Sequence, residues 1–368
     1  MHVEGTGLIY RNPKPHVYSR HAYFPSLVKL GRGELLCSMV IGEAFESADC
    51  RVYLARSIDS GESWTLQGRM LPEATDGTFS EACRIMRASD GTLAANVFRY
   101  DRRRIDEGLA NPDTLGFVET ELSVWRSTDG GINWAGPDVV VPPLVGPEFE
   151  LCSPMVELSD GRWMLPTSTW RAWDGADPTG MKAVAFVSHD RGANWPEYVD
   201  VLDGSAEKVI YWESKIVELS PGRLVSIGWS YDEAAQGDRT NACSISNDGG
   251  RSFGPPVDTG LHGQTAALHR LDDERLLCVY RRTDAPGLWA AEVSLADGRW
   301  QTLRQEPLWA AGSLLTGETD ENRIRQFNVL RFGAPCVIDL DDGGVLVAFW
   351  AVEDCVGNIR WLKVAVDR

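Results

Sequence analysis

The sequence predicts an all-β protein, a six-bladed β-propeller whose blades are four-stranded antiparallel sheets. Two internal repeats predict this fold: a short turn motif in four copies and a strand–turn–strand hairpin in six. The 36 glycines and 14 tryptophans among the 368 residues agree with it, because they indicate many tight turns with an aromatic side chain nearby.

The short repeat has the pattern S-x-D-x-G-x-[SN]-[WF] and follows a β-type run each time. Its copies are 57–64 (SIDSGESW), 127–134 (STDGGINW), 188–195 (SHDRGANW) and 246–253 (SNDGGRSF). In such a turn the aspartate accepts hydrogen bonds from backbone N–H groups, the glycine takes an unusual φ, and the aromatic side chain holds the hairpin on its sheet. We therefore expect structural roles for Asp59, Asp129, Asp190 and Asp248.

The longer repeat is a hairpin of two strands joined by a tight turn. Its copies start at Leu27, Ile85, Met155, Ile216, Leu268 and Val337. Dividing 368 residues by six gives about 61 residues per copy, which suits a blade of four short strands. For closure, residues 7–10 should form the outer strand of the last blade, whose first three strands run over 336–366. We therefore expect a single domain over 1–368.

The charge balance excludes two classes of partner. The chain has 36 Lys and Arg against 53 Asp and Glu, a formal net charge of −17. A charge of this size repels phosphate backbones and anionic headgroups, so neither nucleic acid nor a membrane surface is expected as a partner.

The expected location is the cytoplasm. The first fifteen residues do not read as a signal peptide, and no run of 18 apolar residues occurs. The eight cysteines are scattered without a CxxC pair, and several lie in apolar runs, so we expect buried, reduced thiols. The six histidines show no HxH or HExxH spacing, so we expect neither a metal nor another cofactor.

The four turn motifs are similar to the Asp boxes, or BNR repeats, of the sialidase superfamily, and the resemblance covers nearly the whole chain. It implies a six-bladed propeller with a pocket where the first strands of the blades converge. In that family three arginines hold the sugar carboxylate, an aspartate is the acid/base, and a tyrosine activated by a glutamate is the nucleophile.

Some positions match this family pattern. Glu213 opens the corresponding fourth-blade strand, Asp49 lies where the acid/base aspartate would be, and Arg281 is placed as one clamp arginine. Others depart from it. Tyr23 stands where the first arginine should be, with Arg20 as a substitute, and the second arginine falls near 228–229. No tyrosine follows Tyr280, and the region where the nucleophile belongs reads RQFNVL over 325–330. A standard sialidase mechanism is therefore not expected.

The loops and strand ends on the predicted pocket face are rich in carboxylates, arginines and tryptophans, a mixture that suits a carbohydrate. The candidate catalytic residues are Asp49, Glu213, Glu81, Glu150 and Tyr211. The candidate substrate-binding residues are Arg20, His21, Arg51, Trp170, Trp212, Trp229, Gln264, Arg281 and Arg331. The expected partner is a small carbohydrate, which includes anionic glycosides and short oligosaccharides.

Three functions follow from these candidates. The first is a glycoside hydrolase with two carboxylates, led by Asp49 and Glu213 with Glu81 and Glu150 in reserve. The second is a lyase acting on a uronate-containing sugar, with His21 or Tyr211 as the base and an arginine on the carboxylate. The third is a sugar-binding propeller without catalysis.

Overall fold

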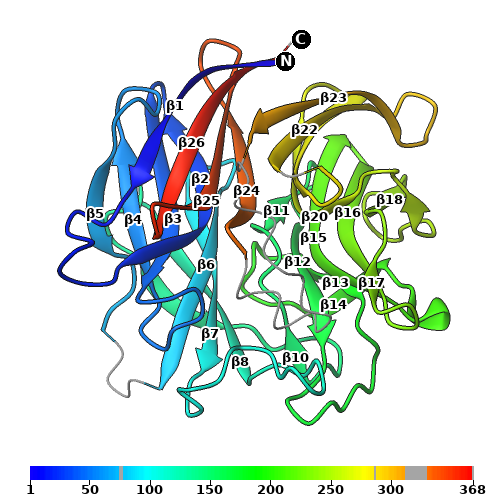
Figure 1. The fold of residues 1–368 in the computed structure, drawn as a ribbon. Helices are drawn as coiled ribbons and strands as arrows, with labels where there is room; N and C mark the ends of the chain where they lie inside the picture. The colour runs from blue at the N-terminus through cyan, green and yellow to red at the C-terminus, as the bar shows by residue number, and fades with distance from the viewer. Residues whose placement is uncertain (74–77, 286, 311–329, 367–368) are drawn as a thin grey trace. The chain divides into compact units, whose positions relative to one another are not determined.

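The computed structural model describes residues 1–73, 78–285, 287–310 and 330–366, and nearly all of their regular structure is β-strand (Figure 1). In these ranges the one helical element is the 3-10 turn η1 (Ser205–Glu207). None of the described helical segments has the length and hydropathy needed to cross a membrane. The chain divides into two compact units, Met1–Val139 with Ser313–Arg368, and Val140–Gly312.

The described part of the first unit contains three four-stranded antiparallel sheets. The first sheet has the order β2 (His21–Gly31), β3 (Glu34–Gly42), β4 (Arg51–Ser57) and β5 (Thr65–Arg69). The second has the order β6 (Phe79–Arg87), β7 (Leu93–Asp101), β8 (Thr120–Ser127) and β9 (Ala135–Val139). The third has the order β24 (Phe332–Asp339), β25 (Val345–Glu353), β26 (Val356–Ala365) and β1 (His2–Tyr10).

The second unit contains three further sheets among its described residues. One has the order β10 (Glu148–Phe149), β12 (Trp163–Trp170), β13 (Ala183–Ser188) and β14 (Glu197–Leu202), with β11 (Val156–Glu157) also paired to β12. The next has the order β15 (Val209–Ser220), β16 (Arg223–Asp232), β18 (Ala242–Ser246) and β19 (Val257–Asp258), with β17 (Gly237–Asp238) also paired to β16. The last has the order β20 (Gly263–Arg270), β21 (Arg275–Arg282), β22 (Gly287–Ser294) and β23 (Gln301–Trp309).

The six-bladed β-propeller predicted from the repeats is confirmed. Each of the six hairpin copies lies on the first two strands of one sheet, and strand order follows chain order except in the sheet of β24. There the N-terminal strand β1 is the fourth strand: it pairs with β26 in antiparallel register, Gly7 opposite Trp361 and Tyr10 opposite Ile359 (Figure 1, blue and red). That the six sheets form one single domain over 1–368 stays a prediction.

The four turn motifs join the third and fourth strands of four sheets and have one hydrogen-bond pattern. The serine Oγ accepts the N–H of the glycine four residues later at 2.9, 2.8, 2.7 and 2.9 Å, and donates to the aspartate Oδ1. The aspartate accepts the N–H of the residue four places on at 2.8–3.0 Å. The residue four places on also donates from its side chain, and its side-chain and N–H bonds, with the serine hydroxyl, lower the pKa of Asp129, Asp190 and Asp248 to about 2.

In each turn the glycine four residues after the serine has a φ between +74° and +91°, a conformation that suits a residue without Cβ. Trp64 and Trp134 fix their own turns by donating Nε1–H to the glycine carbonyl at 2.9 and 3.2 Å. The structural role predicted for the four aspartates therefore agrees with the geometry. The sheet of β20–β23 has a different turn between its third and fourth strands, where Leu295 N–H donates to the Glu274 carbonyl at 2.7 Å.

The cores lie between neighbouring sheets within each unit. In the first unit one buried cluster joins β2–β4 to β6–β8 and another joins β2–β4 to β24–β26 and β1; in the second unit, corresponding clusters join β12–β14 to β15–β18 and β15–β16 to β20–β22. All eight cysteines are free thiols. Six are buried, as predicted, whereas Cys336 is half-buried and Cys355 is exposed.

The buried serine of the turn motif gives a stability prediction. In Ser57→Ala the N–H of Gly61 keeps no acceptor, so we expect a loss of about 1–2 kcal/mol of unfolding free energy in urea titrations. Ser63→Ala is the matched control in the same turn, because its hydroxyl makes only an exposed bond to Asp59. Equal losses from both variants would contradict the role assigned to the buried hydroxyl.

Candidate functional site

The closest contact between predicted catalytic carboxyl residues is in the second unit, where Glu213 N–H donates to Glu150 Oε2 at 2.8 Å. Glu150 directly follows β10 and Glu213 lies within β15. Both residues are half-buried. The sequence held Glu150 in reserve and favoured Asp49 as the partner of Glu213. Asp49 belongs to the first unit and Glu213 to the second, so that pairing stays a prediction.

A β-bulge in the first strand of the sheet places Glu213. The register of β15 against β16 shifts between Trp212 and Lys215, and Glu213 has a φ of +49°. Phe24 and Ala334, on the first strands of two other sheets, have φ of +53° and +46° beside similar shifts. Such a φ costs a non-glycine residue of the order of 1 kcal/mol, so packing must hold it. Of these three residues only Glu213 has an ionisable side chain.

Glu150 is fixed through its backbone and its carboxylate. Its N–H donates to the Ser168 carbonyl at 3.0 Å, and its carbonyl accepts Thr167 Oγ1–H at 2.8 Å. Cys152 Sγ–H donates to Glu150 Oε2 at 3.4 Å, and Lys215 Nζ donates to the Cys152 carbonyl. The carboxylate therefore lies between a backbone N–H, a thiol and a nearby ammonium group.

This environment raises the pKa of Glu150 to about 7. Desolvation of the carboxylate is the main cause and the charge of Glu213 is the second; the Glu213 N–H and the Lys215 charge oppose them. Burial and the neighbouring charge of Glu150 also raise the pKa of the Cys152 thiol, so this cysteine stays protonated. Near neutral pH, Glu150 is therefore divided between a proton donor and a carboxylate.

The three predicted tryptophans of this unit pack against one another. Trp212 stacks on Trp170 with centroids 5.5 Å apart and on Tyr231 at 5.3 Å, and it meets Trp229 edge to face at 5.2 Å. Trp212 is only 3% exposed. In this structure its neighbouring rings therefore occupy the surfaces that a sugar would stack on, and the predicted stacking role stays a prediction.

Gln264, Arg281 and Trp229 are joined into one hydrogen-bond network. Arg281 Nε and Nη2 donate to Gln264 Oε1 at 2.9 and 2.6 Å, and Gln264 Nε2 donates to Asp238 Oδ2 at 2.8 Å. The other oxygen of Asp238 accepts Trp229 Nε1–H at 2.8 Å. The structure thus brings together three predicted binding residues through Asp238. Arg281 is buried, at 7% exposure.

Tyr211 lies on β15 and is buried. Burial raises the pKa of its phenol, which opposes the loss of a proton that a base or nucleophile needs.

In the first unit, Asp49 organises the loop between β3 and β4. Its Oδ1 accepts the N–H of Glu43 at 2.9 Å and the Ser47 hydroxyl at 2.6 Å, and its Oδ2 lies 3.9 Å from Arg20 Nη1. Arg51 Nη1 donates to the carbonyls of Ala48 and Cys50 at 3.0 and 2.8 Å. The side chains of Asp49 and Arg51 therefore stabilise the conformation of this loop.

The remaining candidates of the first unit are His21, Glu81 and Arg331, and Glu81 N–H donates to the Cys50 carbonyl of that loop at 3.0 Å. His21 Nδ1 accepts the Gly357 N–H at 2.8 Å, and burial lowers the pKa of its imidazole, which keeps the ring neutral near pH 7. Glu81 is 2% exposed with Arg69 Nη2 at 3.7 Å. Arg331 is half-buried, and its Nη1 donates to the Leu330 carbonyl at 3.4 Å. The stretch 325–329 lies outside the described residues.

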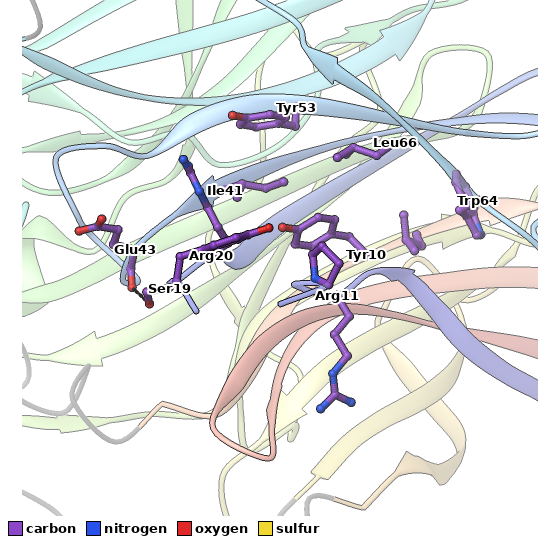
Figure 2. Close-up of a pocket in the computed structure, with 12 residues that line it drawn as sticks. Tyr10, Arg11, Ser19, Arg20, Ile41, Glu43, Tyr53, Trp64 and Leu66 are labelled. Carbon is purple, nitrogen blue, oxygen red and sulfur yellow. Dashed lines mark hydrogen bonds between the residues drawn. The ribbon is translucent and has the colours of Figure 1, made fainter. Parts of the chain in front are cut away.

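A cavity of about 730 Å³ also lies in the first unit, with Arg20 among the residues that line it (Figure 2). Four aromatic residues line it as well, Tyr10, Tyr18, Tyr53 and Trp64. Only Arg20 of the predicted site residues is among its lining residues.

Sequence reasoning missed three groups at these sites: Cys152, Lys215 and Asp238. Cys152 and Lys215 each follow a predicted glutamate by two residues, but Glu150 and Cys152 lie outside β10 and a bulge interrupts β15 before Lys215, so strand alternation could not have identified them. Asp238 lies on the two-residue strand β17, which no pattern predicted. Within the described ranges no group of three His, Cys, Asp or Glu side chains is placed to hold a metal ion.

Comparison with known proteins supports the fold. No protein-family model matches the chain, and no curated protein matches its sequence. A Dyadobacter fermentans protein of unknown function has a similar structure, with 22% identity, a TM-score of 0.75 and coverage of 99% of both chains. The NanB sialidase of Streptococcus pneumoniae matches with 11% identity and a TM-score of 0.65 over 98% of this chain and 70% of its own.

The intramolecular trans-sialidase of Ruminococcus gnavus has 13% identity and a TM-score of 0.65, over 100% of this chain and 98% of its own. At these identities the similarity shows the fold: this chain has the six-bladed β-propeller of sialidases. The sialidase-like architecture expected from the turn motifs is therefore confirmed at the level of structure.

The raised pKa of Glu150 gives a prediction for stability. A carboxyl whose pKa rises from 4.5 to about 7 on folding stabilises the fold fully below pH 4.5, and that contribution is lost as pH rises through 7. Glu150→Gln stays neutral, so between pH 4.5 and 8 its unfolding free energy should rise by roughly 2–3 kcal/mol relative to the wild type. Urea titrations at several pH values measure this difference. The exposed Glu207→Gln is the control, and a pH-independent difference for Glu150→Gln would contradict the assignment.

Proposed function

We propose that this protein is a glycoside hydrolase with a pair of carboxyl groups, Glu150 and Glu213, acting on small glycosides or oligosaccharides, anionic ones included. The observation that carries the proposal is the hydrogen bond from the Glu213 backbone N–H to Glu150 Oε2 at 2.8 Å, together with a pKa of about 7 for Glu150. Where two carboxyl groups hydrolyse a glycosidic bond, one gives a proton and the other acts as the carboxylate.

Glu150 is the general acid in this proposal. Its raised pKa lets Glu150 hold a proton near neutral pH, and this proton passes to the glycosidic oxygen as the bond to the anomeric carbon breaks. Glu213 is the carboxylate that faces the positive charge developing at the anomeric carbon. Either Glu213 attacks the anomeric carbon or it takes a proton from the water that does, and the anomer of the product distinguishes these routes.

The sialidase-like fold supports a carbohydrate substrate, and the Glu150–Glu213 pair supports hydrolysis without a tyrosine nucleophile. No tyrosine follows Tyr280 in the sequence, and burial of Tyr211 raises the pKa of its phenol. We also propose that the four serine–aspartate turns are the Asp boxes of that superfamily. Their aspartates accept hydrogen bonds from backbone N–H groups of the turns. They therefore stabilise the hairpins and have no part in the hydrolysis proposed for Glu150 and Glu213.

The proposal includes a cytoplasmic location and a soluble, small carbohydrate as partner. A net charge of −17 opposes binding to nucleic acid or anionic lipid. No cofactor is part of the proposed reaction.

The leaving group of the substrate tests the proposed roles. Nitrophenolate leaves without a proton, whereas an alkoxide or sugar alkoxide needs one. In Glu150→Gln we therefore expect kcat to fall less than tenfold on a nitrophenyl glycoside, and by about 10²-fold or more on the methyl glycoside or disaccharide of the same sugar. Glu213→Gln should lower kcat by about 10²-fold or more on both. Steady-state kinetics on a panel of neutral and uronate glycosides measure these values.

The pH profile is the second measurement. Wild-type kcat/KM on the unactivated substrate should fall as pH rises above about 7, because Glu150 loses its proton. Glu207→Gln should have the wild-type profile. Full activity of both Glu150→Gln and Glu213→Gln on the disaccharide would overturn the proposal, and an unsaturated product absorbing in the near ultraviolet would replace it with lyase chemistry.

A further inference from the structure

The cavity of the first unit has the size of a small-ligand site and is distinct in its residues from Glu150 and Glu213. Its volume of about 730 Å³ lies within the range of sites that hold drug-sized molecules. In Figure 2 Tyr53 lies along one side, Glu43 and Trp64 lie at opposite ends, and Tyr10 and Arg20 lie between them. The space suits one or two sugar rings.

Aromatic side chains form much of the wall. Tyr10 is the last residue of β1, Tyr53 lies on β4, and Trp64 directly precedes β5. Trp64 is fixed by its Nε1–H bond to the Gly61 carbonyl at 2.9 Å. Tyr18 adds a fourth ring, 43% exposed. Rings of this kind present apolar faces with a polar edge, which suits the C–H face and hydroxyl rim of a sugar.

The loop between β1 and β2, which carries Tyr18, Ser19 and Arg20, is held in place. Asn12 is buried; its Nδ2 donates to the Tyr18 carbonyl at 2.7 Å, and its Oδ1 accepts the Lys14 N–H at 2.9 Å. Ser19 Oγ donates to the Glu43 carbonyl at 2.8 Å, which ties this loop to the end of β3. The wall is therefore built by specific bonds.

Arg20 gives the cavity a cation that its neighbours leave available. Among the described residues its guanidinium makes no hydrogen bond, and its one ion pair is the 3.9 Å approach to Asp49. Its side chain is 42% exposed, whereas Arg11, also on the wall, pairs with Asp354 at 3.2 Å. The charged lining residues are Arg11, Arg20 and Glu43, and of the two arginines only Arg20 lacks a partner within hydrogen-bond distance among the described residues.

We propose that this cavity is a second carbohydrate site, which binds a sugar residue bearing a carboxylate. The sugar ring lies against Tyr53 and Tyr10, Arg20 binds the carboxylate, and Glu43 accepts hydroxyl groups at the cavity's end. A guanidinium fits a carboxylate with two parallel hydrogen bonds, which a neutral sugar cannot provide. The site is one of binding and adds to the proposed hydrolysis without depending on it.

Ligand-observed NMR titrations with glucuronate and glucose test the proposal on the full chain. Glucuronate should bind at least fivefold more tightly than glucose, and its advantage should shrink as NaCl is raised from 20 to 300 mM, because the carboxylate contact is screened. Arg20→Met should bring the two dissociation constants to within twofold of each other. Arg32→Met, which removes an exposed arginine outside the cavity, should keep the wild-type preference.

The aromatic wall is tested with Tyr53→Ala, which should weaken both sugars at least fivefold, and Tyr53→Phe, which keeps the ring and should weaken them less than threefold. Arg20→Lys keeps a charge and should retain part of the preference if Arg20→Met does not fold. Glu150→Gln should bind glucuronate in this cavity as the wild type does, so loss of hydrolysis and loss of this site are separate results. Equal binding of the two sugars by the wild type, or a preference unchanged in Arg20→Met, would overturn the proposal.

Discussion

A buried serine hydroxyl that accepts a glycine N–H sets the turn from the third to the fourth strand in four of the six sheets. The interaction is local, since all its partners lie within eight residues, so each sheet can close without help from distant chain. The aspartate of the same turn takes a further N–H and thereby uses its carboxylate structurally. This arrangement leaves the loops at the other strand ends free to differ, and the residues proposed for chemistry come from strands and loops outside these turns.

The candidate site in the second unit combines a strained backbone at Glu213 with repulsion between the carboxylate charges of Glu150 and Glu213. Glu213 has a left-handed backbone in the middle of a strand, and its N–H, turned out of the ladder by the bulge, donates to Glu150. The same residue thus supplies a hydrogen bond that favours the ionised form of Glu150 and a charge that opposes it. Because desolvation adds to the opposition, the balance falls near neutral pH. A bulge placed one residue away would turn a different N–H toward Glu150.

The fold was predictable because its signals are local and repeated. Turn serines, aspartates and glycines at fixed spacing, and hairpins at regular intervals, identify each sheet, and even the pairing of β1 with β26 followed from the missing fourth strand. The site was less predictable because its contacts are long-range. Glu150 and Glu213 are 63 residues apart, and a register shift that no sequence pattern encodes brings them together. The mutual packing of Trp170, Trp212 and Trp229 was equally hidden, since a tryptophan near a loop reads the same whether its ring is stacked or open.

The pairing of β1 with β26 also has a consequence for the order of events during synthesis. β1 is made before β26 and all the described strands between them, so β1 has no ladder to join while those strands are translated. At 5–20 residues per second this interval is of the order of tens of seconds. Only Ile9 of the nine residues of β1 is buried, so few β1 side chains must find a core before β26 is made. The sheet of β24, β25, β26 and β1 can therefore be completed only after β26 has been made.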